Sequence, residues 1–371
     1  MRLFRLLFLA AISYQLLATF AALLHLLLRR RSHRRVEPDF FSGVSVLKPL
    51  RGMDPNTHEA FISQINQRYP RFEILFGARD ENDPAALEVH RLQREYPDAP
   101  IRLIIGGEST RNGKVGVLMA LAREARYPIW VINDSDIKVD PEYLSRVVPP
   151  LKDVSVGLVT CPYRADAHNL PAAWESLGIA TDFMPSTLVA QLLGVRDFGL
   201  GSTLAFRGED LERVGGFAAI ADFLADDYQL AKRITTLGKR TVLSTYTVET
   251  SLADATWIGI WRHQLRWART IRLTKGAGHV GLPITHAGLW ALIAIACGAW
   301  LFAAILLAAR IISALSVGWF VLRSRVVARY FWLAPLWDVY SFVIWLASYA
   351  SRKVRWRDQH LLIDRGGRIQ V

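Results

Sequence analysis

The sequence predicts an α/β domain with a mostly parallel sheet, flanked by transmembrane helices at both ends of the chain. Between residues 42 and 250, short apolar strands alternate with helical segments of about ten residues, as in βαβ units. Long apolar stretches lie near both ends of the 371 residues, and basic residues flank them. These observations indicate an α/β protein attached to a membrane.

The composition agrees with membrane attachment. Apolar residues make up 51% of the chain, and the net charge of +12 comes largely from arginines beside the apolar runs. A basic balance suits nucleic acid, a membrane surface or anionic substrates. The sequence has no zinc-ligand spacing, helix-turn-helix pattern or aromatic ribonucleoprotein motif, so we expect no nucleic-acid partner. Cys161 and Cys297 lie far apart in the sequence, and Cys297 is inside an apolar run. The sequence therefore gives no sign of a disulfide framework.

Residues 1–35 are predicted to form a transmembrane anchor with a basic flank. The stretch 3–28 is almost wholly apolar and long enough to span a bilayer, and five arginines follow it between positions 29 and 35. A cleavable signal peptide would have a shorter apolar region that ends in small residues. The basic flank predicts that the following domain faces the cytoplasm, at the inner cell membrane.

The region 36–255 is predicted to be the α/β domain. Strands are expected at 44–47, 72–77, 101–105 and 127–132. Helices are expected at 57–67, 84–95 and 115–125, with Thr57 as a possible N-cap and Pro84 in a first turn. This alternation implies parallel neighbours joined by right-handed crossovers.

The remaining chain is predicted to contact the bilayer. In the segment 256–280, an amphipathic helix over 257–272 carries tryptophans on one face and arginines on another, which suits the membrane interface. The region 281–350 is predicted to hold two spans, 286–309 and 331–349. The mixed stretch 310–329 between them could be an interfacial or re-entrant helix. The basic tail, 351–371, is expected in the cytoplasm, although the arginines at 323, 325 and 329 disagree with that topology.

The strand at 127–132 ends in a turn that carries two carboxylates, Asp134 and Asp136. Their spacing lets both reach one divalent ion, and Mg²⁺ and Mn²⁺ prefer such oxygen ligands. A solvated Asx turn is the alternative for this short motif. Open α/β sheets bind ligands at the carboxyl ends of their strands, which favours the metal site.

Three further polar residues follow predicted strands. Lys48 could contact a nucleotide, Asp80 could accept a hydrogen bond from uracil or ribose, and Lys114 beside a helix N-terminus suits a phosphate. Each has an ordinary alternative. Lys48 could simply mark the end of a strand, Asp80 could cap a helix, and Lys114 could be a solvated lysine.

Two features lie beyond these strands. Asp226 and Asp227 are adjacent where a helix begins, so repulsion could raise the pKa of one carboxyl enough for it to act as a general base; simple capping is the alternative. Arg266 and Trp267 lie on the interfacial helix. Arginine can clamp a leaving diphosphate, although an isolated Arg-Trp pair also suits a membrane-surface anchor.

Taken in order, these motifs resemble the membrane-bound, processive-type glycosyltransferases, and within them the ceramide glucosyltransferase family. The resemblance covers nearly the whole chain and is most specific in 224–231 and 261–272. Bacterial ceramide glucosyltransferases look most similar, and hopanoid-linked sugar transferases share much of the pattern. The resemblance implies a GT-A fold, a UDP-sugar donor, a divalent metal (Mg²⁺ or Mn²⁺), a membrane-lipid acceptor and inversion at the anomeric carbon.

The resemblance also implies roles for the candidate residues. Asp227 would be the general base, with Asp226 in support, and Asp134 and Asp136 would serve the metal and the diphosphate. The remaining donor-binding candidates are Lys48, Asp80, Lys114, Gly201, Arg266 and Trp267. Of these, Gly201 would lie under the sugar. Arg266 and Trp267 would close the family's Gln/Arg-x-x-Arg-Trp motif, whose first position is His263 here.

We therefore expect transfer of a hexose, glucose in the first instance, from a UDP-sugar to ceramide, with a hopanoid or diacylglycerol as the alternative acceptor. Two other functions stay open on the residues alone. The small number of C-terminal spans argues against a glycan-polymerising synthase with a channel, and the intact carboxylates argue against a catalytically silent membrane scaffold.

Overall fold

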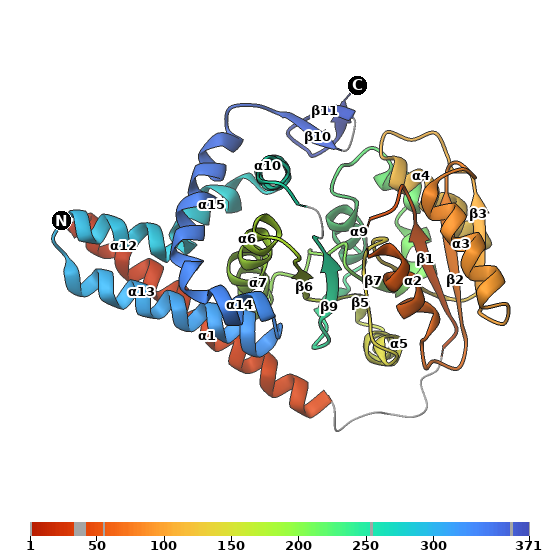
Figure 1. Cartoon of the computed structure of the whole chain (residues 1–371), viewed down its shortest axis with the longest axis horizontal. Coiled ribbons are helices and arrows are strands. Elements are labelled where there is room, and N and C mark those ends of the chain that lie inside the picture. The colour runs from red at the N-terminus through yellow and green to blue at the C-terminus, as the bar shows by residue number, and fades with distance from the viewer. Residues whose placement is uncertain (1, 33–41, 55, 253–254, 357–358, 371) are drawn as a thin grey trace. The chain divides into compact units, whose positions relative to one another are not determined.

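The computed structural model describes residues 2–32, 42–54, 56–252, 255–356 and 359–370 (Figure 1). The chain forms two compact units. We call the first the sheet unit; it comprises Ser32–Tyr163 and Val195–Ser251. The second, the helical unit, comprises Met1–Arg31, Arg164–Gly194 and Leu252–Val371. A segment from the middle of the chain, Arg164–Gly194, thus belongs with the apolar helices of the two ends.

The sheet unit is built on a seven-stranded sheet with the order β3-β2-β1-β4-β7-β5-β8. Its strands are β1 (Val44–Pro49), β2 (Phe72–Ala78), β3 (Ile101–Ile105), β4 (Ile129–Ile132), β5 (Val156–Thr160), β7 (Leu204–Arg207) and β8 (Arg240–Leu243). The first four pair in parallel, and β5 pairs in parallel with β8. Only β7 is antiparallel to its neighbours β4 and β5. The predicted mostly parallel α/β sheet is therefore confirmed.

The described residues of the sheet unit form six α-helices; the first three begin close to the predicted positions, the last begins at the predicted Asp226, and the other two were not predicted. They are α2 (Thr57–Ile65), α3 (Pro84–Glu95), α4 (Gly113–Glu124), α5 (Tyr143–Val147), α8 (Gly208–Arg213) and α9 (Asp226–Thr235), with short 3₁₀ turns at Pro149–Lys152 and Phe217–Ile220. The suggestion that Thr57 caps α2 is wrong: Asn56 precedes the helix, and the Thr57 hydroxyl instead accepts a hydrogen bond from the Asp54 N–H. Helix α4 begins two residues before its predicted start because Asn112 caps it, accepting hydrogen bonds from the N–H groups of Lys114 and Val115.

The core of the sheet unit lies between the sheet and the helices α4 and α9. Leu47 and Ile132 from the central strands pack in one buried cluster with Leu118 and Leu230 from these helices. Gly77 lets α4 approach closely, since a Cβ there would lie 2.6 Å from a methyl of Val117. The packing brings the start of α4 to the carboxyl ends of the central strands.

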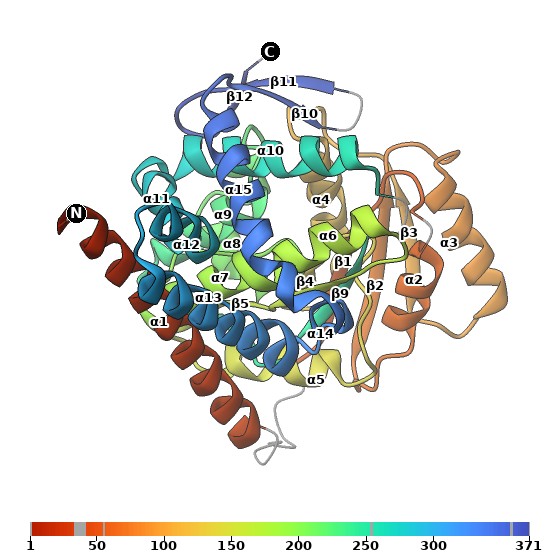
Figure 2. The ribbon, with the colours of Figure 1, turned by 60° about the vertical axis from the view of Figure 1, so that its left-hand side comes forward.

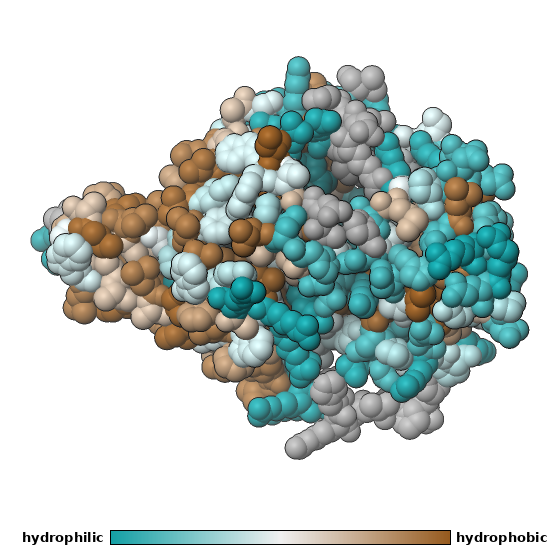
Figure 3. Space-filling view, viewed as in Figure 1, coloured by the Kyte–Doolittle hydropathy of each residue, from teal (hydrophilic) through white to brown (hydrophobic). Residues whose placement is uncertain are grey.

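The helical unit gathers apolar helices from both ends of the chain. They are α1 (Arg2–Ser32), α6 (Leu170–Gly178), α7 (Met184–Leu192), α10 (Trp257–Thr274), α11 (Gly276–Gly281), α12 (Ala287–Ala296), α13 (Trp300–Ala314), α14 (Arg325–Tyr330) and α15 (Ala334–Ser348). The π-helical turns Ile179–Phe183 and Leu315–Val321 and the 3₁₀ turns Leu282–Thr285 and Phe331–Leu333 connect them. Helix α15 packs against α6, α10 and α12 (Figure 2). Hydrophobic residues gather on the surface of α1, α12 and α13 (Figure 3).

The described residues hold three helices long and apolar enough to cross a membrane, at Arg2–Arg31, Trp300–Val321 and Arg325–Ser348. A fourth is possible if the bent pair Gly276–Thr285 and Ala287–Ala296 acts as one span. The predicted apolar helices near both ends of the chain, long enough to cross a membrane, are thus confirmed.

The predicted single span at 286–309 is wrong. The helix breaks at Gly298, whose φ of 69° suits glycine, and α12 folds back on α13. The stretch 310–329 is likewise not a separate interfacial helix, because α13 continues through Arg310 to Ala314 and on through the π-helical turn. Arg310 can lie inside this apolar helix because Asp338 of α15 neutralises it, at 2.7 Å.

The tail forms structure that the sequence did not predict. Three antiparallel strands, β10 (Lys353–Trp356), β11 (Gln359–Ile363) and β12 (Ile369–Gln370), make a small sheet that packs on α10. Two further short strands, β6 (Tyr163–Asp166) and β9 (Val248–Ser251), lie where the chain passes from one unit to the other.

Candidate active site

One lysine joins two of the predicted carboxylate motifs in the sheet unit. The Lys114 ammonium lies 2.7 Å from Oδ1 of Asp134 and 3.2 Å from Oδ2 of Asp226. The first carboxylate follows β4, and the second begins α9. The two motifs lie about ninety residues apart in the sequence, but their carboxylates share one cation. This cation lies at the carboxyl end of the sheet, where open α/β sheets bind ligands.

Hydrogen bonds from the cap of α4 set this arrangement. The Asn112 side chain donates to the carbonyl oxygen of Phe223 at 2.8 Å, and its backbone N–H donates to that of Ala221 at 2.9 Å. Both acceptors lie just before α9. Asn112 therefore holds the start of α4, with Lys114, against the start of α9, with Asp226. The sequence shows the Asn-Gly-Lys pattern, but it does not show that Asn112 bonds to the segment before α9.

Lys48 lies beneath the turn that follows β4. Its buried ammonium donates to the side-chain oxygen of Asn133 and to the backbone carbonyl of Asp134, each at 2.8 Å. Burial lowers the pKa of Lys48 to about 7, although the negative charges of Asp136 and Asp134 oppose this. Lys48 thus supports the turn, while its predicted contact with the donor stays a prediction. Sequence reasoning missed Asn133, a polar residue that ends an apolar strand.

Asp134 and Asp136 are near enough for the charge of one to act on the other. Burial raises the pKa of Asp136, and the charge of Asp134 raises it further. The Thr250 hydroxyl donates a hydrogen bond to Oδ2 of Asp136, a contact with no sequence signal. Within the described ranges, no three His, Cys, Asp or Glu side chains are grouped around a possible metal. The two aspartates fit a Mg²⁺ or Mn²⁺ ion that takes its other ligands from phosphate oxygens and water, as Mg²⁺ commonly does.

Asp227 is held by two backbone N–H groups. Its Oδ2 accepts from Gly201 at 3.1 Å, and its Oδ1 accepts from Tyr228 at 2.7 Å. A Cβ on Gly201 would lie 2.9 Å from Oδ2 of Asp134 and 3.7 Å from Oδ2 of Asp227. Gly201 therefore lies between the two carboxylates, and the missing side chain keeps the space between them open.

The two adjacent carboxylates differ in their electrostatic surroundings. Burial and then the charge of Asp226 raise the pKa of Asp227 to about 6, against the opposing charge of Lys114 and the hydrogen bond from Tyr228. Burial alone would lower the pKa of Lys114, but Asp134 and Asp226 together raise it, so its ammonium stays charged. Asp226 thus has a permanent cationic partner, and Asp227 is the carboxylate suited to accept a proton near neutral pH.

Among the described residues, no hydrogen bond or ion pair links the side chain of Asp80 to this cluster. Asp80 is exposed at the end of β2, where its Oδ1 accepts a hydrogen bond from the N–H of Asn82 at 2.9 Å, as in an Asx turn. The neighbouring Asp83 caps α3 and also accepts from the N–H of Gly52, which follows β1, at 2.9 Å. The side chain of Asn82 also donates to Oδ1 of Asp80, and the predicted contact of Asp80 with a nucleoside stays a prediction.

Arg266 and Trp267 lie on α10, in the helical unit. The Trp267 ring contacts the rings of His263, at 4.7 Å, and Phe183, at 5.3 Å. Nδ1 of His263 lies 2.5 Å from Oε1 of Glu175, which also accepts a hydrogen bond from Gln264. His263, at the motif position where the family has Gln or Arg, therefore contacts a buried glutamate. Glu175 was not identified as a partner from the sequence.

Comparison with known proteins identifies the family. The model of glycosyl transferase family 21 matches residues 10–369. The chain is 31% identical over 243 residues to ceramide glucosyltransferase 1 of Caenorhabditis elegans, which covers 64% of this chain and 52% of that protein. It is 34% identical over 119 residues to the ceramide glucosyltransferase of Komagataella phaffii, which covers 31% of this chain and 23% of that protein. The first match thus spans about half the length of the relative.

A solved structure supports the fold. The mannosyltransferase PcManGT from Pyrobaculum calidifontis, in complex with GDP-Man and Mn²⁺, matches 92% of this chain and 99% of its own, with a TM-score of 0.53 and 22% sequence identity. The predicted GT-A class and the predicted resemblance to ceramide glucosyltransferases are both confirmed, as is the expected enzyme class. The chain belongs to glycosyl transferase family 21.

Proposed function

We propose that this protein transfers a hexose, glucose in the first instance, from a UDP-sugar to the hydroxyl of a membrane lipid, with inversion at the anomeric carbon. One observation carries the proposal: Lys114 joins Asp134 to Asp226, and Gly201 lies between Asp134 and Asp227. This arrangement supports a charged site for a diphosphate beside a carboxylate that can take a proton. The names of the relatives support ceramide as the acceptor.

Asp227 acts as the general base in this proposal. The lipid oxygen attacks the anomeric carbon as the bond between that carbon and the diphosphate oxygen breaks, and the hydroxyl proton passes to Asp227. Its pKa of about 6 keeps the carboxyl ionised at neutral pH while leaving it basic enough to accept a proton. Hydrogen bonds from Gly201 and Tyr228 fix its orientation. A single displacement inverts the anomeric centre and requires no covalent enzyme intermediate.

The departing UDP carries the negative charge that develops in this step. Asp134 and Asp136 would hold a divalent cation, Mg²⁺ or Mn²⁺, which would stabilise the diphosphate as a Lewis acid. Lys114 remains charged beside Asp134, so it can contribute to the same stabilisation. Arg266 would clamp the diphosphate, and Trp267 would support it, as the family motif implies. Asp80 would bind the uridine.

The acceptor stays in the bilayer, which accounts for the apolar helices at both ends of the chain. We propose that the sheet unit faces the cytoplasm at the inner cell membrane, because Arg29, Arg30 and Arg31 end the first candidate span. A hopanoid or diacylglycerol is the alternative acceptor, since each also offers a hydroxyl at the membrane surface.

The test is transfer by the purified full-length protein. It is incubated with UDP-[¹⁴C]glucose, UDP-[¹⁴C]galactose or UDP-[¹⁴C]N-acetylglucosamine in vesicles that contain ceramide, a hopanoid or diacylglycerol, and the lipids are separated. We expect a labelled glucosylceramide that forms only with added Mg²⁺ or Mn²⁺. A labelled hopanoid or diacylglycerol would correct the acceptor. The absence of labelled lipid in every combination would favour a catalytically silent scaffold, and labelled polymer would favour a glycan synthase.

A further inference from the structure

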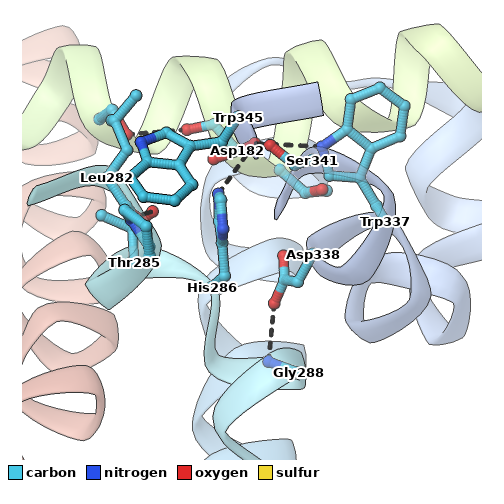
Figure 4. A network of polar contacts seen from close by, with 12 residues as sticks. Asp182, Leu282, Thr285, His286, Gly288, Trp337, Asp338, Ser341 and Trp345 are labelled. Carbon is cyan, nitrogen blue, oxygen red and sulfur yellow. Dashed lines mark hydrogen bonds and ion pairs between the residues drawn. The ribbon is translucent and has the colours of Figure 1, made fainter. Parts of the chain in front are cut away.

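A charged side chain lies among the apolar helices of the helical unit, and the proposed chemistry does not use it. Asp182 belongs to the π-helical turn Ile179–Phe183, and its Oδ2 accepts hydrogen bonds from Nε1 of Trp337, at 3.1 Å, and the hydroxyl of Ser341, at 3.0 Å (Figure 4). Both donors come from α15. A carboxylate in such surroundings is costly and commonly marks a functional site, as π-helical turns also do.

The nearby arginine does not neutralise Asp182 through a direct contact. Arg310 uses Nε and Nη2 to bind Asp338, at 2.7 to 3.0 Å, and Nη1 to bind the carbonyl oxygen of Thr181, at 2.8 Å. The second oxygen of Asp338 also accepts from the N–H of Gly288, at the start of α12. This ion pair is fully buried and complete in itself.

Among the described residues, the side chain that faces Asp182 as a possible ion-pair partner is His286, which is charged only when protonated. Its Nε2 lies 3.9 Å from Oδ2 of Asp182, too far for a hydrogen bond (Figure 4). The ring is buried, and its Nδ1 has no hydrogen-bond partner within the described part of the chain. Nε2 is thus the nitrogen that faces the carboxylate, whereas Nδ1 is a buried polar atom whose lack of a hydrogen-bond partner in the described part of the chain calls for an explanation, such as a ligand.

Asp182 can also be reached from outside the protein. Its side chain is 20% exposed, whereas that of His286 is 3% exposed. The hydrogen bonds from Trp337 and Ser341 both go to Oδ2, which orients the carboxylate and leaves Oδ1 able to accept from a ligand. An ionised carboxylate can only accept hydrogen bonds, and it repels a phosphate.

We propose that Asp182 and His286 bind the polar headgroup of an uncharged lipid, with an amide N–H of the lipid, or a hydroxyl other than the one that receives the sugar, donating to Oδ1 of Asp182. The surrounding apolar helices would hold the acyl chains. This inference rests on the proposed function, since it makes this lipid the sugar acceptor. The site selects neutral headgroups with hydrogen-bond donors over anionic phospholipids.

The experiment measures lipid binding without any sugar donor. The full-length protein in nanodiscs is labelled with a photoactivatable ceramide whose reactive group is near the headgroup, and the labelled peptides are identified. We expect labelling within 179–186 or 334–348, with competition by unlabelled ceramide and none by phosphatidylglycerol. Labelling confined to other segments would overturn the proposal whatever the variants do.

The matched variants are Asp182→Asn and Asp166→Asn, the second of an exposed aspartate of the same unit. Asparagine still accepts from Trp337 and Ser341, so the helices should stay packed, but the charged acceptor is lost. We expect ceramide affinity to fall about tenfold or more in Asp182→Asn, as for a hydrogen bond to a charged group. The ceramide KM should rise in parallel, with the UDP-sugar KM unchanged. Asp166→Asn should match the wild type.

The outcomes separate this inference from the proposed function. If the wild type transfers sugar to ceramide and a stable Asp182→Asn has normal ceramide affinity and KM, the lipid site is wrong and the function stands. If no sugar is transferred, but ceramide still labels the predicted segments and Asp182→Asn still weakens its binding, the lipid site stands and the function is wrong. If Asp182→Asn is unstable, the labelled segments decide the question.

Discussion

Replacing Asp227 with asparagine should stop catalysis while leaving the protein folded. Asparagine has the same shape, and its one carbonyl oxygen can keep the hydrogen bond from either Gly201 or Tyr228. Losing the other should cost about 1–3 kcal/mol of stability, well below the 5–15 kcal/mol of an ordinary domain. The loss of a general base typically lowers the rate by about 10²–10⁴-fold, or about 3–5 kcal/mol in the activation barrier. We therefore expect kcat to fall at least about 10²-fold.

The companion variant, Asp226→Asn, tests whether the two carboxylates have different roles. Lys114 would keep Asp134 as its partner, so we expect kcat to change by less than about tenfold. Because the charge of Asp226 raises the pKa of Asp227, its removal should also move the acidic limb of the pH profile to lower pH. Both variants are assayed for transfer of [¹⁴C]glucose to one lipid acceptor, and their UDP-sugar affinity is measured by calorimetry.

The affinity of Asp227→Asn for the UDP-sugar should stay within a few-fold of the wild type, because the base contacts the acceptor rather than the donor. If Asp226→Asn is inactive and Asp227→Asn nearly normal, the two roles are reversed. If both variants are nearly normal, the pair is a structural helix start and the proposed mechanism is wrong.

Four further predictions address the metal, the proton, the membrane helices and the topology. Asp136→Ala should abolish transfer and remove the Mn²⁺ dependence of UDP binding, measured by calorimetry, because Asp134 alone offers too few oxygens; unchanged Mn²⁺-dependent affinity would contradict the metal site. Since Asp227 must be ionised to act, wild-type kcat/KM should be half-maximal near pH 6 and fall about tenfold per pH unit below it; a flat profile from pH 5 to 8 would contradict this. Arg310→Met should cost about 3–5 kcal/mol by leaving Asp338 buried without its partner, and Arg310→Met/Asp338→Asn should recover part of it in thermal unfolding; an unchanged Tm in the single variant would show that the pair is dispensable. A cysteine introduced near Pro84 should resist an impermeant thiol reagent in intact cells, and ready labelling would place the sheet unit outside.

Local signals in the sequence were enough to predict the sheet unit's first half. Strands such as β2 and β3 are short apolar runs ended by polar residues, and Pro84 marks the start of α3. Residues that end a strand fall at one edge of a parallel sheet by geometry alone, which is why the placement of Lys48 and Asp134 was predictable. The later strands, β5, β7 and β8, offered no such alternation with long helices and were not predicted.

The helical unit was harder to predict, because a hydropathy pattern does not reveal where an apolar segment turns. Residues 286–309 are apolar throughout, and only Gly298 marks the point where α12 ends and the chain folds back. Arg310 looked like the end of a span since its partner, Asp338, lies in a different predicted element. The pairing of a charge across two helices cannot be read from either helix alone.

The distinction between Asp226 and Asp227 shows what a sequence motif leaves undecided. Two adjacent carboxylates are chemically identical in a sequence, and repulsion alone predicts only that one of them will be harder to ionise. Lys114 makes the difference: it contacts Asp226, while Asp227 contacts backbone N–H groups. Asn112 sets that contact by fastening α4 to the segment before α9. The assignment of the base therefore depends on a helix cap more than a hundred positions away, so replacing Asn112 should alter the pH dependence of transfer without removing any group that touches the substrates.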